Sequence, residues 1–183
     1  MIILLFIILI GVAVWSVVIY NRLVRLGNLI RESWSNVDTE LKRRYDLIPN
    51  LEEIVKGYAR HEKDVMENLA RARSQAVRST GSPESQALDE NALISALRTV
   101  FAVAENYPEL KASKHFLELQ NELANTEDRI QAARRFYNGN VREYNILTET
   151  FPSRIVASFS GARQREYFKI DRGISGINPE IGF

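Results

Sequence analysis

The sequence predicts an all-α protein with an N-terminal transmembrane helix, an antiparallel bundle of long helices, and a flexible C-terminal tail. Three observations lead to this fold class. The chain opens with a long uncharged apolar run, two later stretches repeat apolar residues at helical spacing, and glycines are scattered through the final residues. We expect an anchor over 1–20, a helical bundle over 21–151, and a partly disordered tail over 160–183.

The composition limits the chemistry that the chain can perform. With 183 residues, it suits one domain and an appendage. A net charge of +1 gives no bulk electrostatic reason to bind nucleic acid. Cysteine is absent, which excludes disulfides, thiolate nucleophiles and cysteine-ligated zinc. Because His61 and His115 are the only histidines, few candidate catalysts are left.

The anchor is predicted from Ile2 to Tyr20, a run of IILLFIILIGVAVWSVVIY without a charged residue. Nineteen residues at about 1.5 Å each span about 28 Å, close to the ~30 Å hydrocarbon core of a bilayer. The alternative, a cleaved signal peptide, would need a basic segment first and small residues at its end. No lysine or arginine precedes the run, and bulky residues follow its only small pair, Gly11 and Ala13. An uncleaved single span is therefore favoured.

Basic residues predict the orientation of this span. Arg22, Arg25 and Arg31 follow the apolar run, whereas only the α-amino group precedes it. The positive-inside rule then favours a bundle on the cytoplasmic side of the membrane.

The next stretch predicts a long helix with one apolar seam. Its two heptad series are Trp34, Leu41, Ile48, Val55, Glu62, Leu69 and Ala76, and Ile30, Val37, Arg44, Leu51, Tyr58, Val65 and Ala72. The register passes Pro49 without a phase break, so we expect a continuous helix that is kinked at Pro49. The alternative is two nearly coaxial helices that meet at Asp46–Asn50, with Asp46 as the capping residue.

Arg44 is a charged exception in this seam. Inside a core it would need a buried carboxylate partner, and Glu62 is about 27 Å away along one helix. We therefore interpret Arg44 as lying at the solvated edge of the seam. Together with Lys42 and Arg43, it forms the candidate contact for a protein partner or for anionic lipid. An upright helix would hold this cluster about 30 Å from the bilayer, which favours a solvated or partner-facing role.

Two further helices and a tail are predicted beyond this seam. The stretch RSTGSPESQ breaks the chain, and a shorter helix over about 88–105 ends before the Tyr107–Pro108 dipeptide. A second long helix is expected over about 109–150, where Pro152 stops it. Its seam includes Phe116, Leu123, Ile130, Tyr137, Tyr144 and Phe151. Within the tail, REYFKI (165–170) is the candidate segment for pairing with another element.

Three strings resemble the LemA family of bacterial membrane proteins. They are YNRLVRLGNLIRESWSNVDTELKRRYDLIPNLEEIVKGYARHE, ENYPELKASKHFLELQNELANTEDRIQAARRFYNGNVREYN and FPSRIVASF. The resemblance implies a single membrane helix followed by a helical bundle, the LemA domain, which would extend to about residue 159. It also implies that the protein is located in the bacterial cytoplasmic membrane. It implies no enzymatic activity. The tail after Phe159 is longer than we expect for the family, so nothing carries over to it.

No motif for chemistry emerges from the sequence. The pair His61 and Glu62 lacks the second histidine of a helical zinc site, and a spacing such as that of His115 and Glu118 occurs on many solvated helices. Gly81 stands alone among serines, unlike a phosphate-binding loop. We therefore predict no catalytic residue, no cofactor and no metal.

The expected function is that of a non-enzymatic scaffold or adaptor at the membrane. Helices of unequal length leave apolar surface uncovered, which an unidentified protein partner or a homo-oligomer would bury. A lipid- or curvature-organising protein is the alternative, and an uncharacterised hydrolase is a further one.

Overall fold

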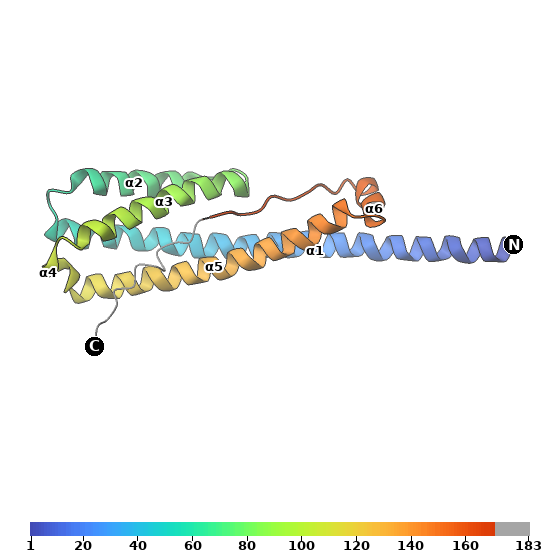
Figure 1. The fold of residues 1–183 in the computed structure, drawn as a ribbon, viewed down its shortest axis with the longest axis horizontal. Coiled ribbons are helices and arrows are strands. Elements are labelled where there is room, and N and C mark those ends of the chain that lie inside the picture. The colour runs from blue at the N-terminus through green and yellow to red at the C-terminus, as the bar shows by residue number, and fades with distance from the viewer. Residues whose placement is uncertain (171–183) are drawn as a thin grey trace. The chain divides into compact units, whose positions relative to one another are not determined.

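The computed structural model describes residues 1–170, and the predicted tail beyond them, 171–183, lies outside the described residues. The described part is helical and has no strand, which confirms the all-α prediction. Its helices are α1 (Ile2–Tyr58), α2 (Lys63–Arg78), α3 (Pro83–Ala104), α4 (Pro108–Lys111), α5 (Lys114–Glu149) and α6 (Ser153–Phe159) (Figure 1).

The chain divides into two compact units. We call residues 1–35 with 135–167 the anchor unit, and residues 36–134 with 168–170 the bundle unit. Helices α1 and α5 contribute residues to both units. The predicted boundaries at residues 20 and 160 stay predictions, because α1 continues past residue 20 without a break.

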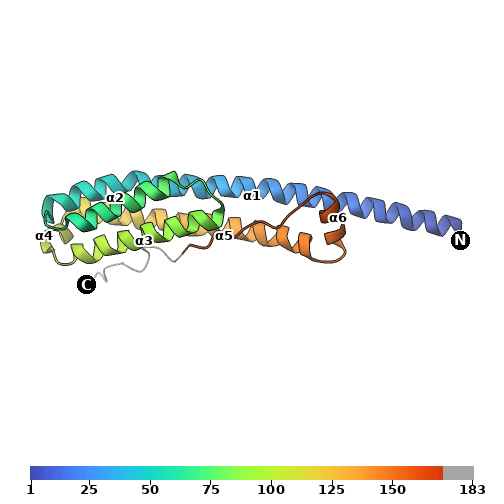
Figure 2. The same ribbon diagram turned by 90° about the horizontal axis from the view of Figure 1, so that it is seen from above.

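The bundle unit packs four helical segments around one apolar core. The second part of α1, then α2, α3 and the first part of α5 lie side by side, and successive helices run in opposite directions (Figures 1 and 2). Each segment contributes buried side chains to this core, among them Leu51, Val55, Leu69, Leu93, Leu97, Phe116 and Leu123. The antiparallel bundle that the sequence predicts is thus confirmed.

The prediction of one uninterrupted helix as far as Ala76 is wrong. Helix α1 ends at Tyr58 and α2 begins at Lys63, with a turn in which the Glu62 amide donates to the Ala59 carbonyl oxygen at 3.2 Å. No glycine or proline lies within this turn. Heptad spacing continues across it because both helices bury their apolar faces in the same core, so periodicity alone does not reveal the reversal.

Helix α1 is continuous through Pro49, which excludes the alternative of two helices meeting at Asp46–Asn50. The bend itself stays a prediction. Proline has no amide hydrogen, so the Tyr45 carbonyl oxygen, four residues earlier, loses its usual helical donor. The Arg73 Nε atom of α2 donates to that oxygen at 2.8 Å. Pro49 therefore leaves an acceptor on α1 that a neighbouring helix uses.

Capping residues set the ends of the shorter helices. Helix α3 starts at Pro83, earlier than predicted, because the Ser82 hydroxyl accepts a hydrogen bond from the Ser85 amide at 3.4 Å and proline suits the first turn.

The last long helix that the sequence predicts is divided in the structure, since α4 ends at Lys111 and α5 begins at Lys114.

The anchor unit packs the first part of α1 against the second part of α5. The rings of Trp34 and Tyr137 have centroids 5.1 Å apart, and the Asn140 side chain donates to the Ser33 hydroxyl at 3.4 Å. The strongest apolar window of the described residues lies in α1, with a mean hydropathy of 3.2 and none of it buried. By length and composition, this part of α1 is suited to cross a membrane.

The predicted pairing of REYFKI is confirmed in both units. In the anchor unit, Asn145 exchanges two hydrogen bonds with the Arg165 backbone at 2.8 and 2.9 Å, and the Tyr137 hydroxyl donates to the Glu166 carbonyl oxygen at 3.0 Å. In the bundle unit, Arg134 donates to the Ile170 carbonyl oxygen at 2.6 Å. The segment is therefore held by polar side chains of α5.

Candidate functional site

Arg44 is completely buried in the bundle unit, so its predicted place at the solvated edge is wrong. The prediction looked for a carboxylate partner along the same helix. The two actual partners are Glu90 of α3 and Glu127 of α5, which lie 46 and 83 residues away in the chain. A charged side chain on each of three helices thus meets inside the core.

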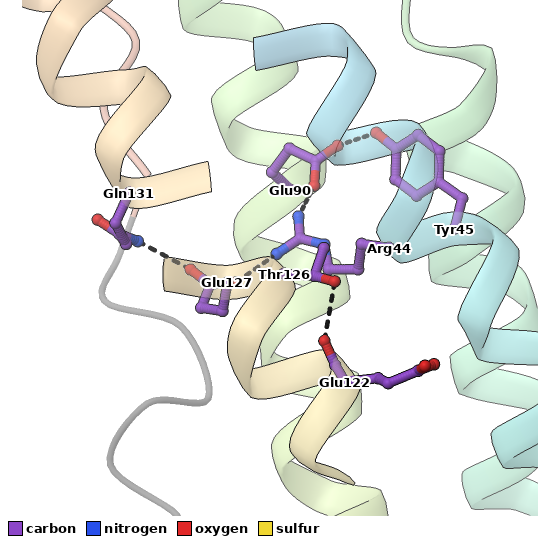
Figure 3. A network of polar contacts seen from close by, with 7 residues as sticks. All are labelled: Arg44, Tyr45, Glu90, Glu122, Thr126, Glu127 and Gln131. Atoms are coloured by element: carbon purple, nitrogen blue, oxygen red, sulfur yellow. Dashed lines mark hydrogen bonds and ion pairs between the residues drawn. The ribbon is translucent and has the colours of Figure 1, made fainter. Parts of the chain in front are cut away.

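The network satisfies both oxygens of each carboxylate (Figure 3). One Arg44 amino group, Nη1, donates to Glu127 Oε2 at 2.9 Å, and the other, Nη2, donates to Glu90 Oε2. The remaining oxygen of Glu90 accepts a bond from the Tyr45 hydroxyl. The remaining oxygen of Glu127 accepts one from Gln131 Nε2 at 2.8 Å. The contacts therefore tie α1, α3 and α5 together in one register.

The charges of this network are not balanced. Two carboxylates face one guanidinium in a place where Glu90 is 1% exposed and Glu127 is fully enclosed. Burial raises the pKa of the Glu90 carboxyl above its ordinary value of 4.5, and the favourable contacts with Arg44 and Tyr45 offset only part of this effect. Burial, followed by the negative charge of Glu90, also raises the pKa of the Tyr45 hydroxyl.

A carboxyl with a raised pKa beside a tyrosine is a combination used in acid–base catalysis. Such chemistry also needs a path for the substrate. Here the side chains of Arg44, Glu90 and Glu127 are 0–2% exposed, so no substrate reaches them in this conformation. The arrangement suits a structural role, in which a buried ionic group fixes how three helices align.

The predicted basic cluster is divided by the fold. Lys42 and Arg43 are exposed, while Arg44 points into the core. The Arg43 Nε atom lies 3.7 Å from the carboxylate of Glu40, and Arg43 also lines a shallow hollow of about 340 Å³ between α1 and α5. A partner or lipid contact through Lys42 and Arg43 stays a prediction, and Arg44 has no surface to offer to it.

The two histidines occupy exposed positions. His61 lies in the turn between α1 and α2, and the His115 side chain is 82% exposed with Nδ1 3.8 Å from Glu118. Within residues 1–170, no group of three or more histidine, cysteine or carboxylate side chains converges as a metal site would require. Glu62 instead accepts a bond from the Tyr107 hydroxyl at 3.0 Å.

Sequence reasoning identified Arg44 as an anomaly but missed both of its partners. A signal was present, since Glu90 shares one helical face with Leu93, Leu97 and other apolar residues that are buried. A lone carboxylate on an apolar helix face is the counterpart that a buried arginine on another helix needs. Pairing the two anomalies would have required knowing which helices are neighbours.

Comparisons with known proteins agree with this architecture. A sequence profile of the LemA family matches residues 33–183. The magnetosome protein MamQ 2 of Paramagnetospirillum magneticum is 25% identical over 175 residues, covering 82% of this chain and 64% of that protein. Protein LemA of Metamycoplasma hominis is 30% identical over 138 residues, covering 74% of this chain and 58% of that protein.

The match to the family includes the tail, so the expectation that the resemblance ends near Phe159 is wrong. The chain spans less than two thirds of the length of these relatives. None of their names is that of an enzyme.

Proposed function

The chain belongs to the LemA family, and from this membership we propose that it is a non-enzymatic scaffold or adaptor. In this proposal α1 crosses the bacterial cytoplasmic membrane once, and the bundle unit binds a protein partner or further copies of the chain on the cytoplasmic side.

The observation that carries this proposal is that the bundle unit encloses its network of ionisable side chains and does not present them in an open cleft. Its perturbed acidic group, Glu90, is enclosed and used to align helices rather than presented in a cleft. A hollow of about 470 Å³ at the α1–α2 turn is lined by side chains of both charges, of which Lys56 and Glu52 lie 3.6 Å apart. Polar, solvent-accessible side chains of this kind form the rim of protein–protein interfaces.

The exposed pair Lys42 and Arg43 is the proposed contact surface for that partner. A photo-reactive amino acid placed at Asn36, which is exposed on the same helix, can capture a neighbour in intact membranes. We expect a cross-linked product with a protein or with a second copy. The double substitution Lys42→Ala/Arg43→Ala should weaken it, while the matched change Arg71→Ala/Arg78→Ala on α2, at two exposed positions, should not.

Three results are informative against this proposal. A chain that stays monomeric in the membrane and yields no enriched product contradicts a scaffold role. Cross-links that go to lipid instead of protein favour the lipid-organising alternative. Equal loss of product in both double variants shows that net charge, and not the Lys42–Arg43 surface, governs the capture.

A further inference from the structure

Helix α6, in the anchor unit, exposes its large apolar residues and buries its small ones. On the helix, Ile155 is 49% exposed and Phe159 is 91% exposed, and Phe151, two residues before the helix, is 83% exposed. Ser153 and Ala157 face inward instead, at 5% and 1%. The Ser153 hydroxyl donates to the Thr150 carbonyl oxygen at 3.0 Å, which holds this orientation. A helix in contact with water normally shows the opposite polarity.

The exposed apolar residues form one continuous surface. Ile155 and Phe159 are four residues apart, a spacing that places them on one side of α6, and Phe151 lies two residues before this helix. Together with Arg154 and Ser158 they line a single shallow hollow of about 390 Å³. We call these five residues the α6 patch.

The packing of α5 on α1 determines which residues of α1 lie beside the α6 patch. A Cβ atom built on Gly27 of α1 would lie 4.0 Å from Tyr144 of α5. The two helices run in opposite directions and have the same rise per residue, so steps along one match steps along the other. Glu149, the last residue of α5 and five residues after Tyr144, therefore comes approximately level with Arg22, five residues before Gly27. Phe151 follows two residues beyond this helix end, near the level of Tyr20.

Tyr20 is also the last residue of the apolar run. Residues 1–14 are all exposed, and the first partly covered positions of α1 are Trp15, Ser16 and Ile19. The rest of the anchor unit thus begins to cover α1 within the final turns of the run. Both views place α6 beside α1 (Figures 1 and 2). If α1 spans the bilayer over this run, α6 lies at the boundary between acyl chains and head groups.

The charges near the patch fit a lipid surface. From Phe151 to Arg163 the charged residues are Arg154 and Arg163, both exposed, and the stretch contains no carboxylate. Exposed aromatic rings with neighbouring basic side chains are typical of segments that lie in the membrane interface, where cations meet anionic head groups.

We propose that the α6 patch is a second membrane contact of this protein. Phe151, Ile155 and Phe159 insert into the head-group boundary of the bilayer that α1 crosses, while Arg154 and Arg163 meet anionic lipid. The proposal rests on the membrane span of α1 that the proposed function also requires. It goes beyond that function, because it assigns a lipid-binding surface outside the span.

Depth-dependent fluorescence quenching tests this contact in the full chain. The sequence has no cysteine, so Phe159→Cys can carry a single environment-sensitive nitrobenzoxadiazole (NBD) label at a highly exposed site. The protein is reconstituted in vesicles of phosphatidylcholine and phosphatidylglycerol that contain spin-labelled lipid. Val14→Cys reports on the span itself. Glu32→Cys, about 18 Å beyond Tyr20 along α1, is the water-exposed control.

We expect blue-shifted emission at Phe159→Cys and lipid quenching about twofold or more above that at Glu32→Cys, as for an interfacial segment. Replacing Arg154 and Arg163 with glutamine should reduce the quenching in anionic vesicles. The matched change Lys63→Gln/Arg71→Gln on α2 should leave it unchanged.

Each contrary pattern overturns the proposal in a distinguishable way. Quenching at Val14→Cys without quenching at Phe159→Cys removes the α6 contact and leaves the anchor intact. No quenching at either site removes the anchor as well. Blue-shifted emission at Phe159→Cys without lipid quenching shows that protein, such as a second copy of the chain, covers the patch.

Discussion

The two units of this protein place polar and apolar side chains in opposite ways. The bundle unit encloses charged side chains, since Arg44 and Glu127 are both 0% exposed. The anchor unit exposes the aromatic rings of Phe151 and Phe159, before and within α6, and turns Ser153 inward. Each choice departs from the usual pattern of polar outside and apolar inside. The bundle unit compensates by pairing its buried charged side chains with one another. In our proposal, α6 compensates by facing lipid.

The largest effect should come from removing Arg44, the cation that both carboxylates of the buried network share. Arg44→Ala leaves Glu90 and Glu127 without their shared donor, which for a broken buried ion pair costs about 3–5 kcal/mol of unfolding free energy. Urea unfolding of the full chain in detergent, followed by circular dichroism, measures it. The triple variant Arg44→Met/Glu90→Gln/Glu127→Gln should recover much of the loss, and a triple variant as unstable as Arg44→Ala would show that packing rather than charge is responsible.

A smaller loss is expected when one hydrogen bond of the network is removed. Tyr45→Phe leaves one oxygen of Glu90 without its donor inside the core, at a cost of about 1–3 kcal/mol. Tyr58→Phe is the matched control, because the Tyr58 side chain is 44% exposed. The same urea experiment compares the two variants, and equal stability of both would contradict the role given to the Tyr45 hydroxyl.

The pH dependence of stability should carry the signature of Glu90. Its pKa is raised in the folded state, so the folded protein binds more protons than the unfolded chain in the window between 4.5 and that raised value. The contribution of Glu90 to stability is therefore fully present below pH 4.5 and is lost as the pH rises through the folded pKa. We expect Glu90→Gln to flatten this decline, and the exposed control Glu122→Gln to preserve it, in urea titrations at a series of pH values.

A still smaller effect on stability is expected at Pro49. Pro49→Ala restores an amide donor to the Tyr45 carbonyl oxygen, which can also keep its bond from Arg73 because it has two lone pairs. The fold should tolerate this change within about 1 kcal/mol of unfolding free energy. A loss of several kcal/mol would show that the predicted bend is itself required.

A substitution on the exposed surface of α6 should change the unfolding free energy far less than Arg44→Ala does. Phe159→Ser removes a large apolar side chain that is 91% exposed, so its unfolding free energy in detergent should change by no more than about 0.5 kcal/mol. A loss comparable to that of Arg44→Ala would show that Phe159 is part of a packed core.

The parts of the fold that depend on local pattern were predictable. The anchor, the helices, and the stops at Gly81 and Pro152 follow from composition and spacing over short windows. The reversal at residues 59–62 was not predictable in this way, because its residues carry no turn signal and the apolar register persists across it. At the site, the anomaly of Arg44 was visible but its partners were not.

By itself, the sequence determined that this protein is helical, that it contains an apolar run long enough to cross a bilayer, and that a charge interrupts its longest seam. These features depend on neighbours within a few turns of helix. Only the tertiary structure decided that the charge is buried against Glu90 and Glu127, and that Phe151 and Phe159, before and within α6, point outward. Both outcomes depend on contacts between residues far apart in the chain, which local spacing does not specify.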